Sequence, residues 1–190
     1  MSPQTLRLFI AINFPDELRA ALHAAMEPLR AAGPDVRWVD APRIHLTVKF
    51  LGEHPDGAVA PLVTSLTRIA AGYEPIPLAL RGLNAFPNLR RPRVVWLGVS
   101  ADPKLELLHH DVEAACAELG HPLVGRTYRP HVTLGRVRER ALDPAALAVA
   151  ARGITYEGAL DAEALDLMVS EHAGGAPGYR VVGSAALSRE

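Results

Sequence analysis

Two histidine–x–threonine triplets are the residues of this chain best suited to chemistry. His45 precedes Thr47 by two positions, and His131 precedes Thr133 in the same way. Both lie in short runs of alternating apolar residues, which favour β-strands and place side chains two positions apart on one face. Near neutral pH one imidazole can accept a proton while another donates one, and threonine hydroxyls can hydrogen-bond anionic oxygens. The paired triplets therefore indicate acid–base chemistry at a phosphodiester; the alternative is two core histidines that happen to precede threonines.

Strict alternation along these strands makes specific predictions about neighbouring residues. In the first run it places Lys49 on the face of the triplet and Phe50 on the opposite face. In the second run it places Arg136 on the face opposite His131. An arginine would strengthen phosphate binding as negative charge develops, and Arg136 is the best candidate. Under strict alternation it reaches the site only if the strand twists or ends there.

A weak internal repeat relates the two triplets. His45 and His131 are 86 positions apart, and the same lag aligns three further pairs. These pairs are Arg7 with Arg93, Asp16 with Asp102, and Leu22 with Leu108. Each half predicts an apolar strand, a helix begun by an aspartate at its N-cap, and a strand that carries histidine. The alternative is that the recurrence has no special meaning, because many α+β proteins show some strand–helix–strand recurrence.

The repeat leads to a prediction for the whole fold. Two equivalent halves related by a pseudo-two-fold axis would bring their histidine-bearing strands together across a shared cleft. We therefore predict an α+β fold in which residues 1–190 form a single two-lobed domain, with two antiparallel-sheet lobes, outer helices and a central cleft. Further helices are expected at 56–71 and 144–151, with strands at 76–83, 155–160, 165–170 and 179–187 and a flexible hairpin connection at 173–178.

The bulk composition is that of an ordinary folded chain of 190 residues, with 49% hydrophobic and 22% charged residues. The first residues lack the features of a signal peptide, and no apolar run approaches the ~20 residues needed to span a bilayer. A single cysteine, Cys116, is typical of a reducing compartment, and its place on the second helix predicts a packed thiol. We therefore expect a cytoplasmic protein that acts as a monomer without a membrane.

The other candidate ligands argue against a metal site or a cofactor. Zinc hydrolases use three protein ligands at recognisable spacings, and neither triplet has a carboxylate, cysteine or second histidine beside it. No phosphate-binding loop of the Gly-x-x-x-x-Gly-Lys type occurs. We expect neither metal nor cofactor. The remaining histidines are expected in solvent or in turns: His23, His54, His109, His110, His121 and His172.

The formal net charge of −1 argues against a protein that tracks long nucleic acid, because such proteins carry a basic excess. Any nucleic acid would be held locally, at a terminus or a single phosphate. The one local basic cluster is Leu89–Arg93, which carries three arginines. It is a candidate RNA contact, and the alternative is a solvated turn.

Longer stretches of the sequence resemble a known family. The chain is similar to the RNA 2′,3′-cyclic phosphodiesterases, also called 2′-5′ RNA ligases, of the two-histidine phosphoesterase superfamily. The similar segments run nearly from end to end: 7–12, 37–39, 45–53, 86–87, 91–98, 129–137, 167–171 and 178–182.

The resemblance implies an activity and a role for each site residue. It implies opening of a terminal RNA 2′,3′-cyclic phosphate to a 2′-phosphate without a metal. In this interpretation His45 donates a proton to the O3′ leaving group and His131 accepts one from water. Thr47, Thr133 and Arg136 correspond to phosphate-contacting positions. The reverse reaction, joining a cyclic end to a 5′-hydroxyl through a 2′-5′ linkage, is implied as well.

Two other functions stay open on the sequence. One is hydrolysis of a small cyclic nucleotide, such as ADP-ribose 1″,2″-cyclic phosphate, with which the near-neutral charge is equally compatible. The other is a noncatalytic module that binds RNA ends. Such a module would need the threonines and the arginine but not both imidazoles, so the presence of both favours turnover.

Overall fold

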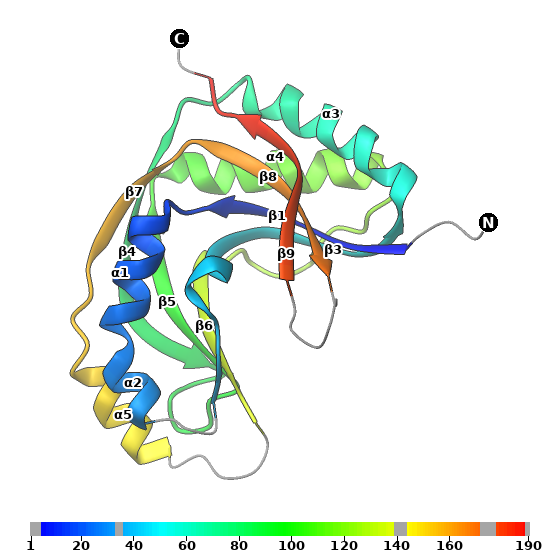
Figure 1. The fold of residues 1–190 in the computed structure, drawn as a ribbon. Coiled ribbons are helices and arrows are strands. Elements are labelled where there is room, and N and C mark those ends of the chain that lie inside the picture. The colour runs from blue at the N-terminus through cyan, green and yellow to red at the C-terminus, as the bar shows by residue number, and fades with distance from the viewer. Residues whose placement is uncertain (1–4, 33–35, 139–143, 172–177, 189–190) are drawn as a thin grey trace.

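The computed structural model describes residues 5–32, 36–138, 144–171 and 178–188 (Figure 1). Nine strands lie in these residues: β1 (Thr5–Asn13), β2 (Val36–Trp38), β3 (His45–Pro55), β4 (Ile76–Phe86), β5 (Val94–Ala101), β6 (His131–Val137), β7 (Gly158–Ala162), β8 (Ala164–Glu171) and β9 (Gly178–Ala186). The helices are α1 (Asp16–Ala25), α2 (Glu27–Ala32), α3 (Val59–Ala70), α4 (Pro103–Glu118) and α5 (Pro144–Arg152), with 3-10 turns η1 (Ala41–Arg43) and η2 (Asp56–Ala58).

The nine strands form one curled antiparallel sheet with the histidine strands at its centre. Its order is β7-β4-β5-β6-β3-β1-β8-β9, and β2 pairs with β6. A pseudo-two-fold axis between β6 and β3 relates β5 to β1, β4 to β8 and β7 to β9. The two halves adjoin through the pair Leu46–Val132. The predicted α+β fold with two antiparallel half-sheets is therefore confirmed, and the halves are joined edge to edge into one sheet.

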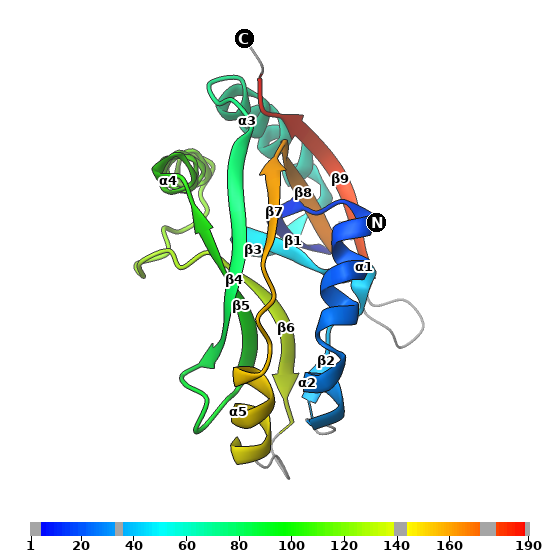
Figure 2. The same cartoon turned by 90° about the vertical axis from the view of Figure 1, so that its left-hand side faces the viewer.

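The helices lie on the outer face of the curl, and each half's crossover helix packs on the strands of the other half. Helices α1, α2 and α5 lie beside β4 to β7, whereas α3 and α4 lie against β3, β8 and β9 (Figures 1 and 2). Helix α3 buries Leu62, Leu66 and Ala70, which recur every four residues and so share one helical face. One apolar core runs beneath both halves of the sheet.

Of the two aspartates predicted as helix N-caps, Asp102 is confirmed and Asp16 is not. Asp102 caps α4 as expected, because its side chain accepts a hydrogen bond from the amide of Lys104 at 2.9 Å. Asp16 is not an N-cap: Pro15 occupies that position, and Asp16 lies in the first turn of α1. There a carboxylate still interacts favourably with the positive end of the helix.

The strand register corrects one alignment in the internal repeat. Ala11 pairs with Thr47, and Trp96 pairs with Thr133. Strands β1 and β5 therefore correspond at a lag of 85 positions, whereas the histidine strands β3 and β6 correspond at a lag of 86. The alignment of Arg7 with Arg93 is therefore wrong. Strand β4 runs three residues past its predicted end, β7 begins at Gly158, and β2 was not predicted. The hairpin connection expected at 173–178 falls almost wholly outside the described residues.

Candidate active site at the junction of the two half-sheets

A β-bulge reshapes β3 just after its histidine–x–threonine triplet. Ala11 pairs with Thr47 and the adjacent Ile10 pairs with Lys49, so Val48 is an extra residue in the ladder. Beyond a bulge the alternation of side chains is reversed. Lys49 is therefore buried on the helix-covered face, whereas Phe50 is 64% exposed and lines the cleft with the triplet. The prediction from strict alternation was wrong for both residues.

A second bulge occupies the equivalent place in β6. Val95 pairs with Gly135 and Trp96 with Thr133, which leaves Leu134 as the extra residue. The bulge turns Arg136 onto the face that carries Thr133, and both residues line the same cavity. The bulge thus removes the objection to Arg136, which was that strict alternation places it on the face opposite His131. The pseudo-symmetric partner of Arg136 is Phe50, so the two halves of the cleft differ in chemistry at this position.

The smallest residue is required next to the second bulge. A Cβ on Gly135 would lie 2.6 Å from Cγ1 of Val36 and 2.8 Å from Cε3 of Trp38. These distances are shorter than van der Waals contact, so only glycine allows β2 to approach β6 this closely. Strand β2 in turn brings Arg37 directly opposite Arg136.

The bulges open onto a cavity of about 610 Å³ on the concave face of the sheet. It contains four of the five sequence-predicted site residues; His131 does not line it. The lining residues are Arg7, Leu8, Phe9, Arg37, Trp38, Val39, Arg43, His45, Thr47, Phe50, Gly52, Thr133, Arg136, Ser170 and Tyr179. Four arginines and no described carboxylate line the cavity, which favours binding of an anion.

His45 is held in one tautomer by its own backbone. Its Nδ1 lies 2.8 Å from the carbonyl oxygen of Arg43, which can only accept, so Nδ1 carries the hydrogen. Its Nε2 lies 3.0 Å from Oγ1 of Thr47. Burial is the largest influence and lowers the pKa of His45; the hydrogen bond to the carbonyl of Arg43 partly opposes it, and the positive charge of Arg19 adds a smaller lowering. The protein environment therefore favours neutral His45, with Nε2 accepting from the threonine hydroxyl.

His131 has the same backbone arrangement and a different set of neighbours. Its Nδ1 lies 2.7 Å from the carbonyl oxygen of Arg129, again two residues earlier, so its Nε2 is the nitrogen left for a proton transfer. Phe86 and Trp96 flank its ring edge-on, at centroid distances of 5.1 and 5.9 Å. The ring of His45 has other aromatic neighbours: its centroid lies 5.1 Å from that of Phe9 and 5.4 Å from that of Tyr179.

Several residues at the site were missed by the sequence interpretation. Arg7, Arg37, Arg43 and Tyr179 line the cavity but come from four different elements. Each reaches the cleft only through strand pairing or chain crossover, so no local spacing could have pointed to it. For Arg7, Arg37 and Tyr179 the sole signal was their inclusion in stretches of family resemblance, and Arg43 had none.

One of the other histidines also differs from expectation. His109 was expected in solvent, yet its ring stacks on Tyr128 at 3.9 Å and its Nε2 lies 3.7 Å from Glu113. His121 follows directly after the turn at residues 119–120, in keeping with its turn-like sequence, and it is buried, with its Nδ1 3.1 Å from Nε2 of His54. His172 lies outside the described residues. Cys116 is a buried free thiol, as predicted.

The described residues offer neither a metal-binding cluster nor a membrane-spanning helix. They contain no group of three or more histidine, cysteine, aspartate or glutamate side chains arranged to hold a metal ion. None of the helices that they form is long and apolar enough to cross a membrane.

Known protein families and solved structures identify the family of this chain. A model of the 2′-5′ RNA ligase superfamily matches residues 14–174. The chain belongs to this superfamily. The resemblance inferred from the sequence is therefore confirmed over most of the chain.

Individual relatives and a solved structure support the assignment. An RNA 2′,3′-cyclic phosphodiesterase of Geobacillus stearothermophilus is 36% identical over 67% of this chain, a match that spans only 41% of that protein. The protein of that name from Methanothermobacter thermautotrophicus is 32% identical over 70% of this chain and 72% of its own. The structure of E. coli LigT with 3′-AMP is 27% identical and superposes with a TM-score of 0.72 over 98% of this chain and 100% of that one.

Proposed function

We propose that this protein opens a terminal RNA 2′,3′-cyclic phosphate to a 2′-phosphomonoester by two-histidine acid–base catalysis, with no metal ion or cofactor. Membership of the superfamily supports a cyclic phosphodiesterase, and relatives carry that name. One observation carries the proposal. Each central strand presents an imidazole whose Nδ1–H is held by the carbonyl two residues earlier, and the two strands adjoin at Leu46–Val132.

In the proposed reaction the two histidines act on opposite sides of phosphorus. Water attacks phosphorus and gives its proton to Nε2 of His131. The P–O3′ bond breaks, and O3′ takes the proton from Nε2 of His45, so the phosphate stays on O2′. Thr47, Thr133 and Arg136 bind the non-bridging oxygens, where charge builds in the transition state.

Binding of the substrate would also prepare His45 for its role. The protein environment lowers the pKa of His45, whereas a proton donor must be charged. An anionic phosphate beside the ring favours the charged form and so raises that pKa. Protonation converts Nε2 from an acceptor into a donor, which ends its hydrogen bond from the hydroxyl of Thr47. The hydroxyl then becomes available to donate to the phosphate.

The exposed aromatic side chains on the His45 side of the cleft suit the nucleoside that carries the leaving oxygen. O3′ belongs to the terminal ribose, so this nucleoside lies on the His45 side. There Phe50 is 64% exposed and Tyr179 is 38% exposed, and both line the cavity. Exposed aromatic rings stack on unpaired bases in proteins that recognise single-stranded RNA.

A product assay tests the proposal directly. Short RNA that ends in a 2′,3′-cyclic phosphate is incubated with the protein, and the product is assigned by phosphorus NMR. We expect a 2′-phosphate, and a 3′-phosphate would retain the chemistry but reverse the assigned pose. His45→Ala and His131→Ala should each lower kcat about 10²-fold or more. The double variant should be far less than multiplicatively worse, because the two residues act as a unit.

Two arms of the assay address the other hypotheses. Exhaustive chelation should leave the rate unchanged, and loss of activity that one divalent ion restores would overturn the metal-free mechanism. ADP-ribose 1″,2″-cyclic phosphate serves as a competing substrate, and faster turnover of it would favour a small-nucleotide phosphodiesterase. Tight binding of the cyclic RNA end without turnover would favour a noncatalytic module. No contact of the described residues favours either alternative.

A further inference from the structure

The two halves of the cleft differ in how their arginines are neutralised. On the His131 side, Arg37 of β2 lies directly opposite Arg136 of β6 in the strand register. Like charges directly opposite on antiparallel strands are destabilising unless a counter-ion lies between them. In the part of the chain that the structure describes, neither arginine forms an ion pair. This arrangement is suited to a polyanion.

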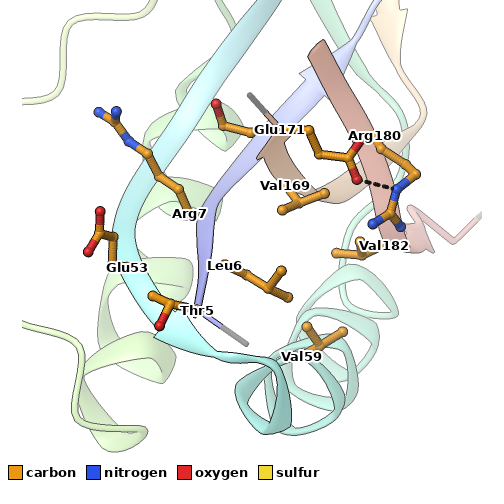
Figure 3. Close-up of a pocket in the computed structure, with 10 residues that line it drawn as sticks. Thr5, Leu6, Arg7, Glu53, Val59, Val169, Glu171, Arg180 and Val182 are labelled. Atoms are coloured by element: carbon orange, nitrogen blue, oxygen red, sulfur yellow. Dashed lines mark hydrogen bonds and ion pairs between the residues drawn. The ribbon is translucent and has the colours of Figure 1, made fainter. Parts of the chain in front are cut away.

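Arginines on the His45 side have carboxylates beside them. Arg43 forms an ion pair with Asp40 at 2.8 Å. Arg7 lies opposite Glu53 in the register of β1 and β3. Figure 3 shows the groove beyond Arg7, where Arg180 forms an ion pair with Glu171 at 2.8 Å. This groove has balanced charge, so it is a poor track for phosphates, although it adjoins the cleft through Arg7.

The basic cluster of the sequence extends the unneutralised arginines of the His131 side. The loop between β4 and β5 begins after Phe86 and ends before Val94, and Val94 is the register partner of Arg136. Both Arg90 and Arg91 are exposed in this loop. The loop lies at the same end of the molecule as β2 and the end of β6 (Figures 1 and 2).

The loop also has a defined shape. The side-chain Oδ1 of Asn88 accepts hydrogen bonds from the amides of Arg90 and Arg91 at 3.0 and 3.1 Å. The amide of Arg93 donates to the carbonyl of Phe86 at 2.7 Å, and the carbonyl of Arg93 accepts from Val137 at 3.0 Å. These bonds hold the loop against the ends of β4 and β6. The exposed arginines of the loop, Arg90, Arg91 and Arg93, are thus presented on a fixed backbone.

The geometry of the proposed displacement indicates which group would bind on the His131 side of the cleft. In an in-line displacement the nucleophile enters opposite the leaving group, which places it beside His131 and away from His45. Water carries no chain and needs no arginines. We propose, on the basis of the proposed function, that Arg37, Arg90 and Arg91 form a track for the phosphates of a second RNA strand whose 5′-hydroxyl takes the place of water.

The atoms of this second reaction balance without a cofactor. The 5′-oxygen attacks phosphorus, and its proton passes to Nε2 of His131. The P–O3′ bond breaks, and O3′ takes a proton from Nε2 of His45. Phosphorus stays on O2′, so the product is a 2′-5′ phosphodiester that joins the two strands. By microscopic reversibility, a 2′-5′-linked RNA cleaved by the protein would occupy the same track with its departing strand.

The test compares hydrolysis with strand joining in the same preparation. A short RNA with a 2′,3′-cyclic phosphate is mixed with 5′-hydroxyl strands of increasing length, from a nucleoside to a tetranucleotide. The KM for the 5′-hydroxyl strand should fall as its phosphates reach the arginines. The double variant Arg90→Ala/Arg91→Ala should weaken this length dependence, because only Arg37 of the track is left, and should leave hydrolysis of the cyclic end unchanged. Arg37→Gln should lower the ratio of joining to hydrolysis.

Salt dependence and matched controls separate charge from structure. Each phosphate contact on a single strand adds about 0.7 to the slope of log affinity against log salt, so the double alanine variant should lose about 1.4. Arg90→Lys/Arg91→Lys keeps the charge and should retain the slope. Arg68→Ala removes an exposed arginine from α3, where it pairs with Glu118, and should change neither reaction.

Each outcome bears on one proposal or the other. A KM independent of strand length, or an alanine double variant with an unchanged slope, overturns the strand track while hydrolysis still supports the proposed function. An equal loss of joining and hydrolysis in the alanine double variant would mean a structural role for the loop, which also overturns the track. Absence of hydrolysis in the wild-type protein overturns the proposed function, and the track that rests on it falls as well.

Discussion

At the scale of single residues, the two histidines share a backbone arrangement and differ in their surroundings. Both use Nδ1–H to hold the carbonyl two residues earlier. Only His45 has a hydroxyl hydrogen-bonded to Nε2. The pKa of His45 is lowered by burial and by Arg19. The pseudo-symmetry therefore supplies two equivalent positions, and the side chains around them make the positions unequal.

The lowered pKa of His45 predicts a pH dependence. A proton donor is lost as pH rises through its pKa, and kcat/KM reports the free enzyme. The alkaline limb of kcat/KM should therefore fall below the ordinary imidazole value of 6.5. The alkaline limb of kcat should lie at higher pH, because bound phosphate raises the pKa of His45. Rate measurements across pH on a cyclic-phosphate RNA give both limbs, and their coincidence would contradict this account.

Arg19 offers a variant outside the cleft that tests the same point. Its charge lowers the pKa of His45, so Arg19→Gln should move the alkaline limb of kcat/KM to higher pH. Arg19→Lys keeps the charge and should leave the limb in place. A shift towards acid in Arg19→Gln would show that the arginine acts otherwise than by its charge.

At the scale of elements, the bulge in β3 has a consequence on the far side of the sheet. It buries Lys49, whose Nζ lies 2.8 Å from Glu113 of α4 and 3.0 Å from the carbonyl of Pro122. Glu113 also accepts from the amide of Val124 at 2.9 Å. The ion pair thus joins the bulged strand to α4 and to the segment that follows α4. A regular strand would have left this lysine in the cleft.

Removal of one partner of this ion pair should be costly. Lys49→Met leaves the Glu113 carboxylate buried without its counter-charge, and we expect a loss of about 3 kcal/mol in the free energy of unfolding. The double variant Lys49→Met/Glu113→Leu removes both charges and should recover much of that loss. Urea unfolding measures both values. A single variant as stable as wild type would mean that the pair is solvated in solution.

A side-chain hydrogen bond links β3 to the segment just before β6. Tyr128 lies three residues before His131, and its hydroxyl donates to the carbonyl of Thr47 at 3.2 Å. Burial raises the pKa of Tyr128, so the hydroxyl stays protonated and able to donate. Tyr128→Phe should cost about 1 kcal/mol of stability. If the bond also positions the two triplets, kcat should fall with little change in KM; an unchanged kcat would leave the bond a purely structural one.

At the scale of the whole molecule, the two halves share one core. Each crossover helix packs on the strands of the other half, and a single apolar cluster contains side chains from both. Neither half could bury its apolar face alone. We therefore propose a single domain with one cooperative unfolding transition, in spite of its two-fold appearance.

Unfolding experiments can check this cooperativity. Trp38 lies in β2 and Trp96 in β5, so tryptophan fluorescence reports mainly on the His131 half, whereas far-ultraviolet circular dichroism reports on all helices and strands. Coincident urea transitions by the two probes are expected for a single domain. Two separated transitions would show that the halves unfold independently.

Local sequence was sufficient to predict most strands and helices of this protein and to single out His45 and His131. Apolar alternation predicted the histidine strands, helical periodicity predicted the main helices, and the repeated triplet pointed to two imidazoles in one cleft. These features are local because they depend on the spacing of side chains within one strand or helix. Longer stretches of resemblance also identified the family, which the match over residues 14–174 confirms.

Only the tertiary structure decided which side chains face the cleft beyond each triplet. The bulges at Val48 and Leu134 arise from pairing with other strands, so alternation within one strand could not predict them. The first bulge places Phe50 in the cleft in place of Lys49, and the second brings Arg136 into the cleft. Arg37 and Arg43 likewise reach the cleft by pairing and chain crossover. Spacing within a segment predicts which side chains share a face until an extra residue interrupts the ladder, and that interruption is set by the partner strand.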